Sequence, residues 1–169
     1  ELMGLTLRRF LCVLLSAALL AAGWLGLSGL PLVVALVPLL WISRSYGSSR
    51  RDWWGMFGWA WLAFVLWNGA TIWGLWYSTP VGPFAATLVN MLAFMLFHTV
   101  SKRAHKALAY TLLVAGWIAT EYWYTVGEFS FPWLLLGNGF ANDTWAVQWY
   151  EYTGIFGGTL WVLVCNLLF

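Results

Sequence analysis

The chain has 169 residues, of which 62% are hydrophobic, 20% aromatic and only 8% charged. An ordinary soluble domain carries about 25% charged residues, so this composition excludes a water-soluble globular protein and indicates an integral membrane protein. The net charge of +2 is small, and we expect no nucleic-acid partner.

Six apolar segments have, or nearly have, the length of about 20 residues that a membrane-spanning helix needs. The first follows Arg8 and Arg9 without a small-residue cleavage site, so we interpret it as a retained helix rather than a signal peptide. The second is short and contains Pro38, which predicts a tilted, kinked or partial span. The fold prediction is an all-α integral membrane bundle of about six transmembrane helices, at residues 10–27, 31–42, 53–77, 84–100, 107–126 and 149–169.

The basic residues lie in alternate connections between these segments. All eight Lys and Arg residues fall within 8–9, 44–51 and 102–106, and the connections 28–31, 77–83 and 127–148 contain none. Because cytoplasmic loops are enriched in Lys and Arg, this distribution predicts a cytoplasmic N-terminus and an aromatic loop at 127–148 on the outer face. We interpret the whole of 1–169 as one transmembrane bundle, and as a fragment of a longer protein.

The stretch 128–158 is the longest segment that a plain membrane helix does not explain. It holds three of the six acidic residues, three Trp and two Tyr, and no Lys or Arg. Its tryptophans are interpreted either as part of an interfacial aromatic belt or as a surface that packs against acyl chains. Gly154 and Gly158 form a GxxxG pattern, which predicts a close contact between helices.

Asn68, Asn90 and Glu121 are polar residues inside predicted spans, at similar depth from the outer ends of their helices. Polar groups within the bilayer are costly and usually face a partner or a cavity, so we predict an intramembrane polar cluster of these three. Two interpretations are open: the cluster joins helices through hydrogen bonds, or it lines a site. Glu121 is the stronger functional candidate, because an unpaired carboxyl group carries the largest penalty.

Other reactive side chains give no catalytic pattern. Cys12 and Cys165 fall inside predicted spans, and we expect them to pack as small apolar residues rather than to form a disulfide. His98 and His105 have no third ligand at metal-site spacing, so we interpret them as interfacial residues and expect no metal and no cofactor. We find no catalytic residue in this chain.

An ordered set of short motifs runs through the chain. They are Trp67-Asn68, the turn at 78–82, Asn90, Trp117-Ile-Ala-Thr-Glu121-Tyr122, FPWL at 131–134, LGN at 136–138, Gln148-Trp149 and Glu151-Tyr152-Thr153-Gly154. This set resembles the apolipoprotein N-acyltransferases, which are bacterial inner-membrane enzymes of lipoprotein maturation. The amino-acid sequences of the later motifs are similar to those of the Bacteroidetes-type members of that family.

The resemblance implies an acyltransferase whose catalytic part is a periplasmic nitrilase-like domain with a Glu-Lys-Cys triad, expected downstream and absent from this chain. It implies transfer of an acyl chain from a membrane phospholipid, by way of a thioester on that cysteine, to the N-terminal diacylglyceryl-cysteine of a lipoprotein. It also implies a multi-pass protein of the bacterial inner (cytoplasmic) membrane with its aromatic loop in the periplasm, and we expect a monomer.

The resemblance also assigns residues to the path of the lipid. The FPW motif matches family residues at the mouth of the lipid-access cavity, and the other matching motifs add further positions. We assign six residues to lipid and substrate access: Glu121, Phe131, Pro132, Trp133, Asn138 and Trp149.

Two alternative functions stay open on the sequence. One is a non-catalytic membrane anchor of a polyprenol-phosphate glycosyltransferase, and the other is a small transporter. Against a transporter, we see neither an inverted repeat nor a pair of broken helices flanking a midplane site. A nitrilase-like domain beyond Phe169, a glycosyltransferase domain, or neither would distinguish the three.

Overall fold

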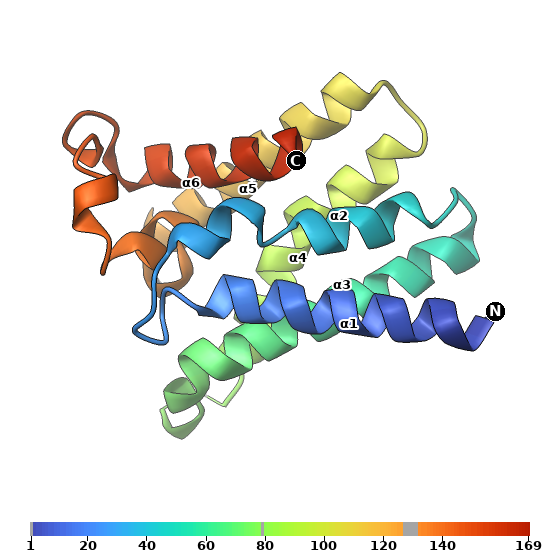
Figure 1. Ribbon diagram of the computed structural model, residues 1–169, viewed down its shortest axis with the longest axis horizontal. Helices are drawn as coiled ribbons and strands as arrows, with labels where there is room; N and C mark the ends of the chain where they lie inside the picture. The colour runs from blue at the N-terminus through green and yellow to red at the C-terminus, as the bar shows by residue number, and fades with distance from the viewer. Residues whose placement is uncertain (1, 79, 127–131) are drawn as a thin grey trace.

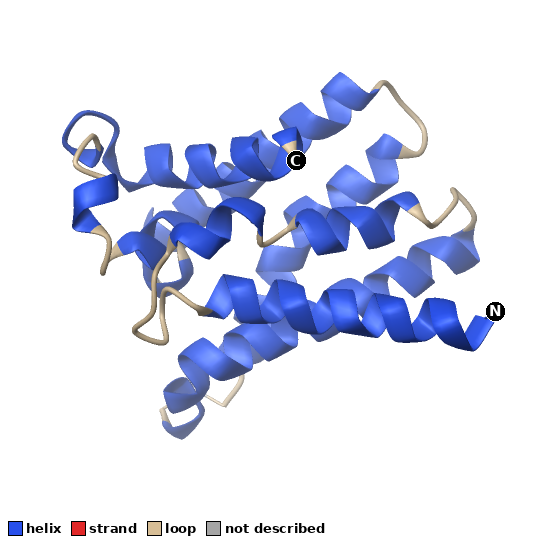
Figure 2. Ribbon diagram, in the orientation of Figure 1, coloured by secondary structure: helices blue, strands red, loops and turns tan. Residues whose placement is uncertain are grey.

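The structure is a computed structural model that describes residues 2–78, 80–126 and 132–169. In these residues every regular element is a helix and none is a strand, which confirms the all-helical prediction (Figure 2). The longer elements are α1 (Leu2–Ala21), α2 (Val37–Arg44), α3 (Arg50–Ile72), α4 (Gly82–Ser101), α5 (Lys106–Val126) and α6 (Tyr150–Leu168). Short 3₁₀ helices are η1 (Leu30–Val34), η2 (Trp73–Tyr77), η3 (Pro132–Leu134), η4 (Leu136–Phe140) and η5 (Thr144–Ala146).

Three of the described helices are both long enough and apolar enough to cross a membrane, namely α1 over Met3–Ala21, α4 and α6. By length alone α3 and α5 also reach across, since they have 23 and 21 residues. The second predicted span is divided into η1 and α2, neither of which is long enough to cross a bilayer.

The charged residues separate the two ends of the bundle. The N-terminus and the α2–α3 and α4–α5 connections lie at one end, on the right of Figure 1, and these are the places that hold all eight Lys and Arg residues. At this basic end the Arg9 guanidinium donates to the Tyr46 hydroxyl at 3.0 Å and to Ser45 Oγ at 3.0 Å. These bonds tie α1 to the connection between α2 and α3.

Side chains of α1 and α6 bind backbone groups at the break between η1 and α2. Asn166 of α6 accepts from the Leu36 N–H through Oδ1 at 2.7 Å and donates from Nδ2 to the Leu32 carbonyl at 2.7 Å. Ser16 Oγ of α1 donates to the Ala35 carbonyl. Since the bilayer core has no water to satisfy such groups, a broken helix is stable there only with partners of this kind.

The start of α6 differs from the GxxxG prediction. Gly154 has φ +64°, so it interrupts the helix and separates the first turn from the rest of α6. A Cβ added to Gly154 would meet no atom within 4 Å, and the space beside Gly158 is filled by the Tyr150 ring of the same helix. The predicted contact between two helices is therefore wrong, and the glycine pair instead lets the first turn fold back.

His98 is buried and contacts a neighbouring helix. Its side chain is 1% exposed, and Nδ1 lies 2.8 Å from Ser43 Oγ, so it joins α4 to α2 inside the bundle. His98 lies in the last turn of α4, and its interpretation as an interfacial residue stays a prediction. His105, in the α4–α5 connection, is exposed.

We predict that Asn166→Leu lowers the free energy of unfolding by about 1–3 kcal/mol, because the buried Leu36 N–H then has no acceptor. Thermal unfolding of the purified protein in detergent measures the loss. Cys165→Ala is the matched control, since Cys165 is the half-buried neighbour on the same helix. An Asn166→Leu variant as stable as Cys165→Ala would contradict the role given to the amide.

Candidate functional site

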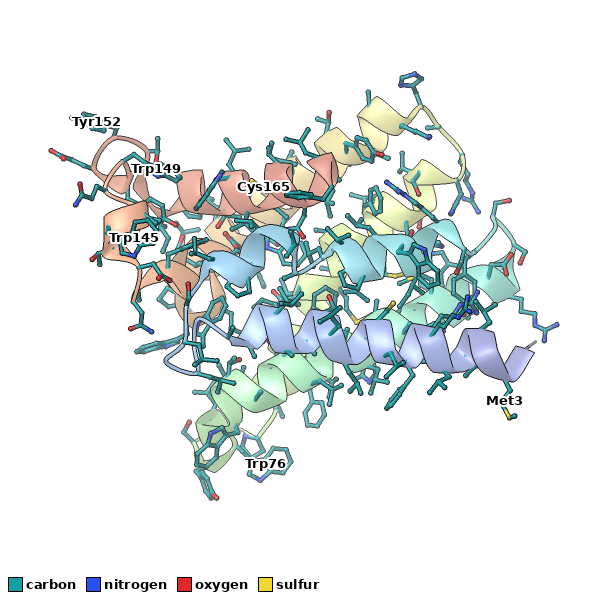
Figure 3. The ribbon with its side chains drawn as sticks, in the orientation of Figure 1. Met3, Trp76, Trp145, Trp149, Tyr152 and Cys165 are labelled. Carbon is teal, nitrogen blue, oxygen red and sulfur yellow. The ribbon has the colours of Figure 1, made fainter. Side chains whose placement is uncertain are left out.

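Residues 132–149, here called the outer segment, connect α5 to α6 at the end of the bundle opposite the N-terminus (Figure 1). Figure 3 places Trp145 and Trp149 of this segment, together with Trp76 of η2, at the end opposite Met3. The segment packs closely on the turn between α1 and η1, since a Cβ added to Gly23 would lie 2.9 Å from the Gly139 Cα. This close contact between backbones therefore requires glycine at position 23.

The Glu121 carboxyl group, which is 1% exposed, joins α5 and α6 to the outer segment. Its Oε1 accepts from the Leu136 backbone N–H at 2.8 Å and from Trp117 Nε1 at 3.1 Å. Its Oε2 accepts from Thr159 Oγ1 of α6 at 2.6 Å. All Lys and Arg residues lie at the opposite end of the bundle, so this buried carboxyl group is satisfied by neutral donors.

Asp143 is a second buried carboxylate, and it holds the outer segment on the α1–η1 turn. Ser28 Oγ donates to its two oxygens at 3.1 and 3.0 Å, and the Gly29 N–H donates to Oδ2 at 2.5 Å. The neighbouring Asn142 donates from Nδ2 to the Leu27 carbonyl at 3.2 Å. The two ends of the outer segment are thus fixed to different parts of the bundle.

Packed aromatic rings connect Trp133 of the outer segment to Glu121 through the core. Trp24 Nε1 donates to the Trp133 carbonyl at 2.7 Å, and the Trp24 ring packs edge-on against Trp67 with 5.6 Å between centroids. Phe64 lies between Trp67 and Trp117, at 6.1 and 5.9 Å. The contacts therefore run from Trp133 through Trp24, Trp67, Phe64 and Trp117 to Glu121, which binds Leu136.

A groove of about 330 Å³ lies between α3, η2 and the start of α4. Four aromatic side chains, which are largely exposed, line it, and small or polar residues complete its surface. The lining includes Trp73, Trp76, Tyr77, Phe84, Val65, Gly69, Pro83, Asn68 and Thr87. An apolar groove that opens on the side of a membrane bundle is suited to hydrocarbon chains, which stay in an apolar medium as they enter.

Asn68 and Thr87 are the polar residues of the groove, and each is 1% exposed. Asn68 Nδ2 donates to Thr87 Oγ1 at 2.8 Å, which joins α3 to α4. The Asn68 Oδ1 atom is buried and has no hydrogen-bond partner among the described residues. A buried acceptor without a partner costs about 1–3 kcal/mol, so this oxygen favours a bound donor group or water molecule in the groove.

That Asn68, Asn90 and Glu121 form one polar cluster stays a prediction. All three are buried. Asn90 lies one helical turn after Thr87 on α4, near the partner of Asn68. The hydrogen bonds of Glu121 instead go to α6, the outer segment and its own helix. Glu121 thus joins elements, and Asn68 both joins helices and lines the groove.

The residues predicted for lipid access lie mostly along the outer segment. Asn138 Nδ2 donates to the Pro132 carbonyl at 2.5 Å, which shapes the turn that presents Trp133, a side chain 65% exposed. Trp149 Nε1 donates to the Ala146 carbonyl at 3.0 Å. Phe131 lies outside the described residues. Whether these residues contact a lipid stays a prediction.

Sequence reasoning missed several residues that hold the site together, chiefly Thr159, Asp143 and Thr87. Threonines within apolar helices are common and give little signal. Asp143 had a usable signal, because an acidic residue in a stretch without Lys or Arg needs neutral donors if it becomes buried.

The fold and these contacts define a class of protein, a helical membrane bundle with an aromatic groove and an ordered outer segment. A family model described as the apolipoprotein N-acyltransferase N-terminal domain matches residues 13–168. The chain is also 31% identical over 139 residues to an apolipoprotein N-acyltransferase of Chlorobaculum tepidum, which covers 80% of this chain. The chain belongs to the apolipoprotein N-acyltransferase family.

The chain spans 25% of the length of that relative, so it corresponds to a part of the longer enzyme. No solved structure is a significant match to the chain. The resemblance recognised from the motifs is confirmed by the family model and the relative.

We predict that Glu121→Ala increases hydrogen exchange at the Leu136 amide by about tenfold or more, since leaving a buried amide without its acceptor costs about 1–3 kcal/mol. Exchange measured by mass spectrometry over the outer segment tests this. Glu121→Gln keeps an acceptor for the amide and is expected to have a smaller effect. Glu151→Ala, at an exposed carboxylate of the same end, is the control. Equal exchange in Glu121→Ala and the control would contradict the assignment.

Proposed function

We propose that this chain is the membrane part of an apolipoprotein N-acyltransferase, which transfers an acyl chain from a phospholipid to the N-terminal diacylglyceryl-cysteine of a lipoprotein. The observation that carries the proposal is the aromatic groove between α3 and α4, in a chain of this family. A nitrilase-like domain outside this chain supplies the cysteine that holds the acyl chain as a thioester. The described residues contribute binding and position rather than a nucleophile.

We place the protein in the bacterial inner membrane as a multi-pass protein, with the basic end in the cytoplasm. The separation of all eight Lys and Arg residues from the groove supports this orientation through the positive-inside tendency. The groove and the outer segment then lie at the level of the outer leaflet, where both lipid substrates have their acyl chains and from which a periplasmic domain is accessible.

The groove would act by holding the acyl chain of the substrate in a fixed position. An acyl chain between Trp73, Trp76 and Phe84 stays in apolar surroundings while its ester end is held at a fixed height. The outer segment, fixed by Glu121 and Asp143, sets the boundary at that height. Holding reactants in a productive geometry contributes up to about 7–11 kcal/mol in the most favourable cases, so even partial positioning accounts for a large rate effect.

Four of the six predicted access residues contribute to this path in the proposal. Trp133 presents a large exposed ring, and Asn138 and Pro132 fix the turn that carries it. Glu121 acts through the backbone that it binds, and so it is a positioning residue. The alternatives of a glycosyltransferase anchor and a small transporter gain no support from the comparisons, which both name the N-acyltransferase.

We predict that Gly69→Leu in the full-length enzyme lowers kcat/KM for acyl transfer by about tenfold, which corresponds to about 1.4 kcal/mol of transition-state stabilisation. Gly69 lines the groove and has open space around an added Cβ, so leucine would fill the groove without a clash. Gly58→Leu is the matched control, because Gly58 also lies on α3 with open space beside it. Similar kcat/KM values for the two variants would count against the groove as a substrate site.

We also predict that Trp133→Ala lowers acyl transfer by about tenfold without unfolding the bundle, because its 65% exposed ring adds little to the core. Turnover in vesicles, at matched expression, measures the effect. Trp145→Ala removes a ring of similar exposure, 69%, from the same segment and should retain activity. Unchanged turnover in Trp133→Ala would remove this residue from the proposed path.

A further inference from the structure

A second cavity, of about 160 Å³, lies at the basic end of the bundle and shares no lining residue with the groove. Three cationic side chains line it from different elements: Arg44 at the end of α2, Lys102 just after α4 and Lys106 at the start of α5. No acidic residue is among its described lining residues. We call this cavity the basic pocket.

The inner part of the basic pocket offers hydroxyl groups in fixed positions. Ser43, which is buried, has its Oγ 2.8 Å from His98 Nδ1, and Ser101 Oγ donates to the His98 carbonyl at 2.8 Å. The Ser101 hydroxyl hydrogen is used in its bond to the His98 carbonyl, whereas the Ser43 hydroxyl is free to donate when His98 Nδ1 carries the hydrogen. Cations together with a hydroxyl donor suit a phosphate group.

Part of the lining of the basic pocket is apolar. Leu40 and Phe97 are buried there, and Leu167 of the last turn of α6 adds a third apolar side chain. A pocket for a free, fully hydrated anion would gain nothing from these apolar side chains. The combination of cationic and apolar side chains in one lining matches a molecule with an anionic head and a hydrocarbon body.

The charge balance around the pocket favours an anion. Partial burial lowers the pKa of Lys102, and the nearby Asp52 carboxylate partly offsets this effect. One carboxylate against three cations leaves the region positive. A desolvated ammonium group gains more from an anionic partner than a fully hydrated one does, because the interaction is less screened.

We propose that the basic pocket binds the phosphate group of an anionic phospholipid from the leaflet at the basic end of the bundle. Arg44, Lys102 and Lys106 would surround the phosphate, and the first part of the lipid body would lie against Leu40 and Phe97. Basic pockets between membrane helices at the cytoplasmic face are a known type of lipid headgroup site. This proposal does not depend on the acyl-transfer function, since it concerns the opposite end of the bundle.

Native mass spectrometry of the full-length protein in neutral detergent tests the proposal, with phosphatidylglycerol as the probe and phosphatidylcholine as the zwitterionic comparison. We expect selective retention of phosphatidylglycerol by the wild-type protein. Lys102→Gln combined with Lys106→Gln should weaken binding about thirtyfold, the effect of removing two cations near a lipid phosphate. Lys102→Arg combined with Lys106→Arg should retain it, which separates loss of charge from loss of fold.

The matched control is Arg50→Gln combined with Arg51→Gln, which removes the same charge from the same end but outside the pocket. Equal weakening by both glutamine pairs would overturn the proposal, since binding would then follow surface charge in general. Displacement of the lipid by inorganic phosphate as readily as by added phosphatidylglycerol would also overturn it, because the site would then be one for free phosphate.

Discussion

The Glu121 carboxyl group is the interaction on which the outer end of this bundle depends. It is buried where the chain has no Lys or Arg, so it must be satisfied by neutral donors from its own helix, from α6 and from the outer segment. Because a buried carboxyl group is costly without hydrogen bonds, the outer segment cannot leave the bundle without exposing or orphaning this group. One side chain therefore fixes the relative positions of three elements.

Packed aromatic side chains connect the Glu121 carboxyl group to the groove. Trp117, which donates to Glu121, contacts Phe64, and Phe64 contacts Trp67, the residue before Asn68 in the groove. The groove and the outer segment are thus built on one aromatic core, although they lie in different parts of the sequence. The basic end uses different chemistry, with cations and hydroxyls around a small cavity. The two ends can accordingly bind different parts of the membrane.

Much of the fold could be predicted from the sequence, because apolar length and basic loops are properties of consecutive residues. The polar contacts could not. The depth of a residue along its helix follows from its residue number, but the direction in which its side chain points around the helix axis does not. The sequence therefore predicts one depth for Asn68 and Glu121, whereas the structure shows that they bind different partners. Asn166 and Leu36 are 130 residues apart, and nothing local predicts their bond. The positive φ of Gly154 likewise depends on how the first turn of α6 packs.

The most direct test of the account is photo-crosslinking of the full-length protein in vesicles with a diacylglyceryl lipopeptide that carries a photoreactive group in one acyl chain. The account predicts crosslinks concentrated on groove residues such as Trp73, Trp76 and Phe84, and their loss when unlabelled lipopeptide competes. Crosslinks spread evenly over the exposed surface of the bundle, including Leu11 and Leu15 of α1, and unaffected by competitor would contradict it.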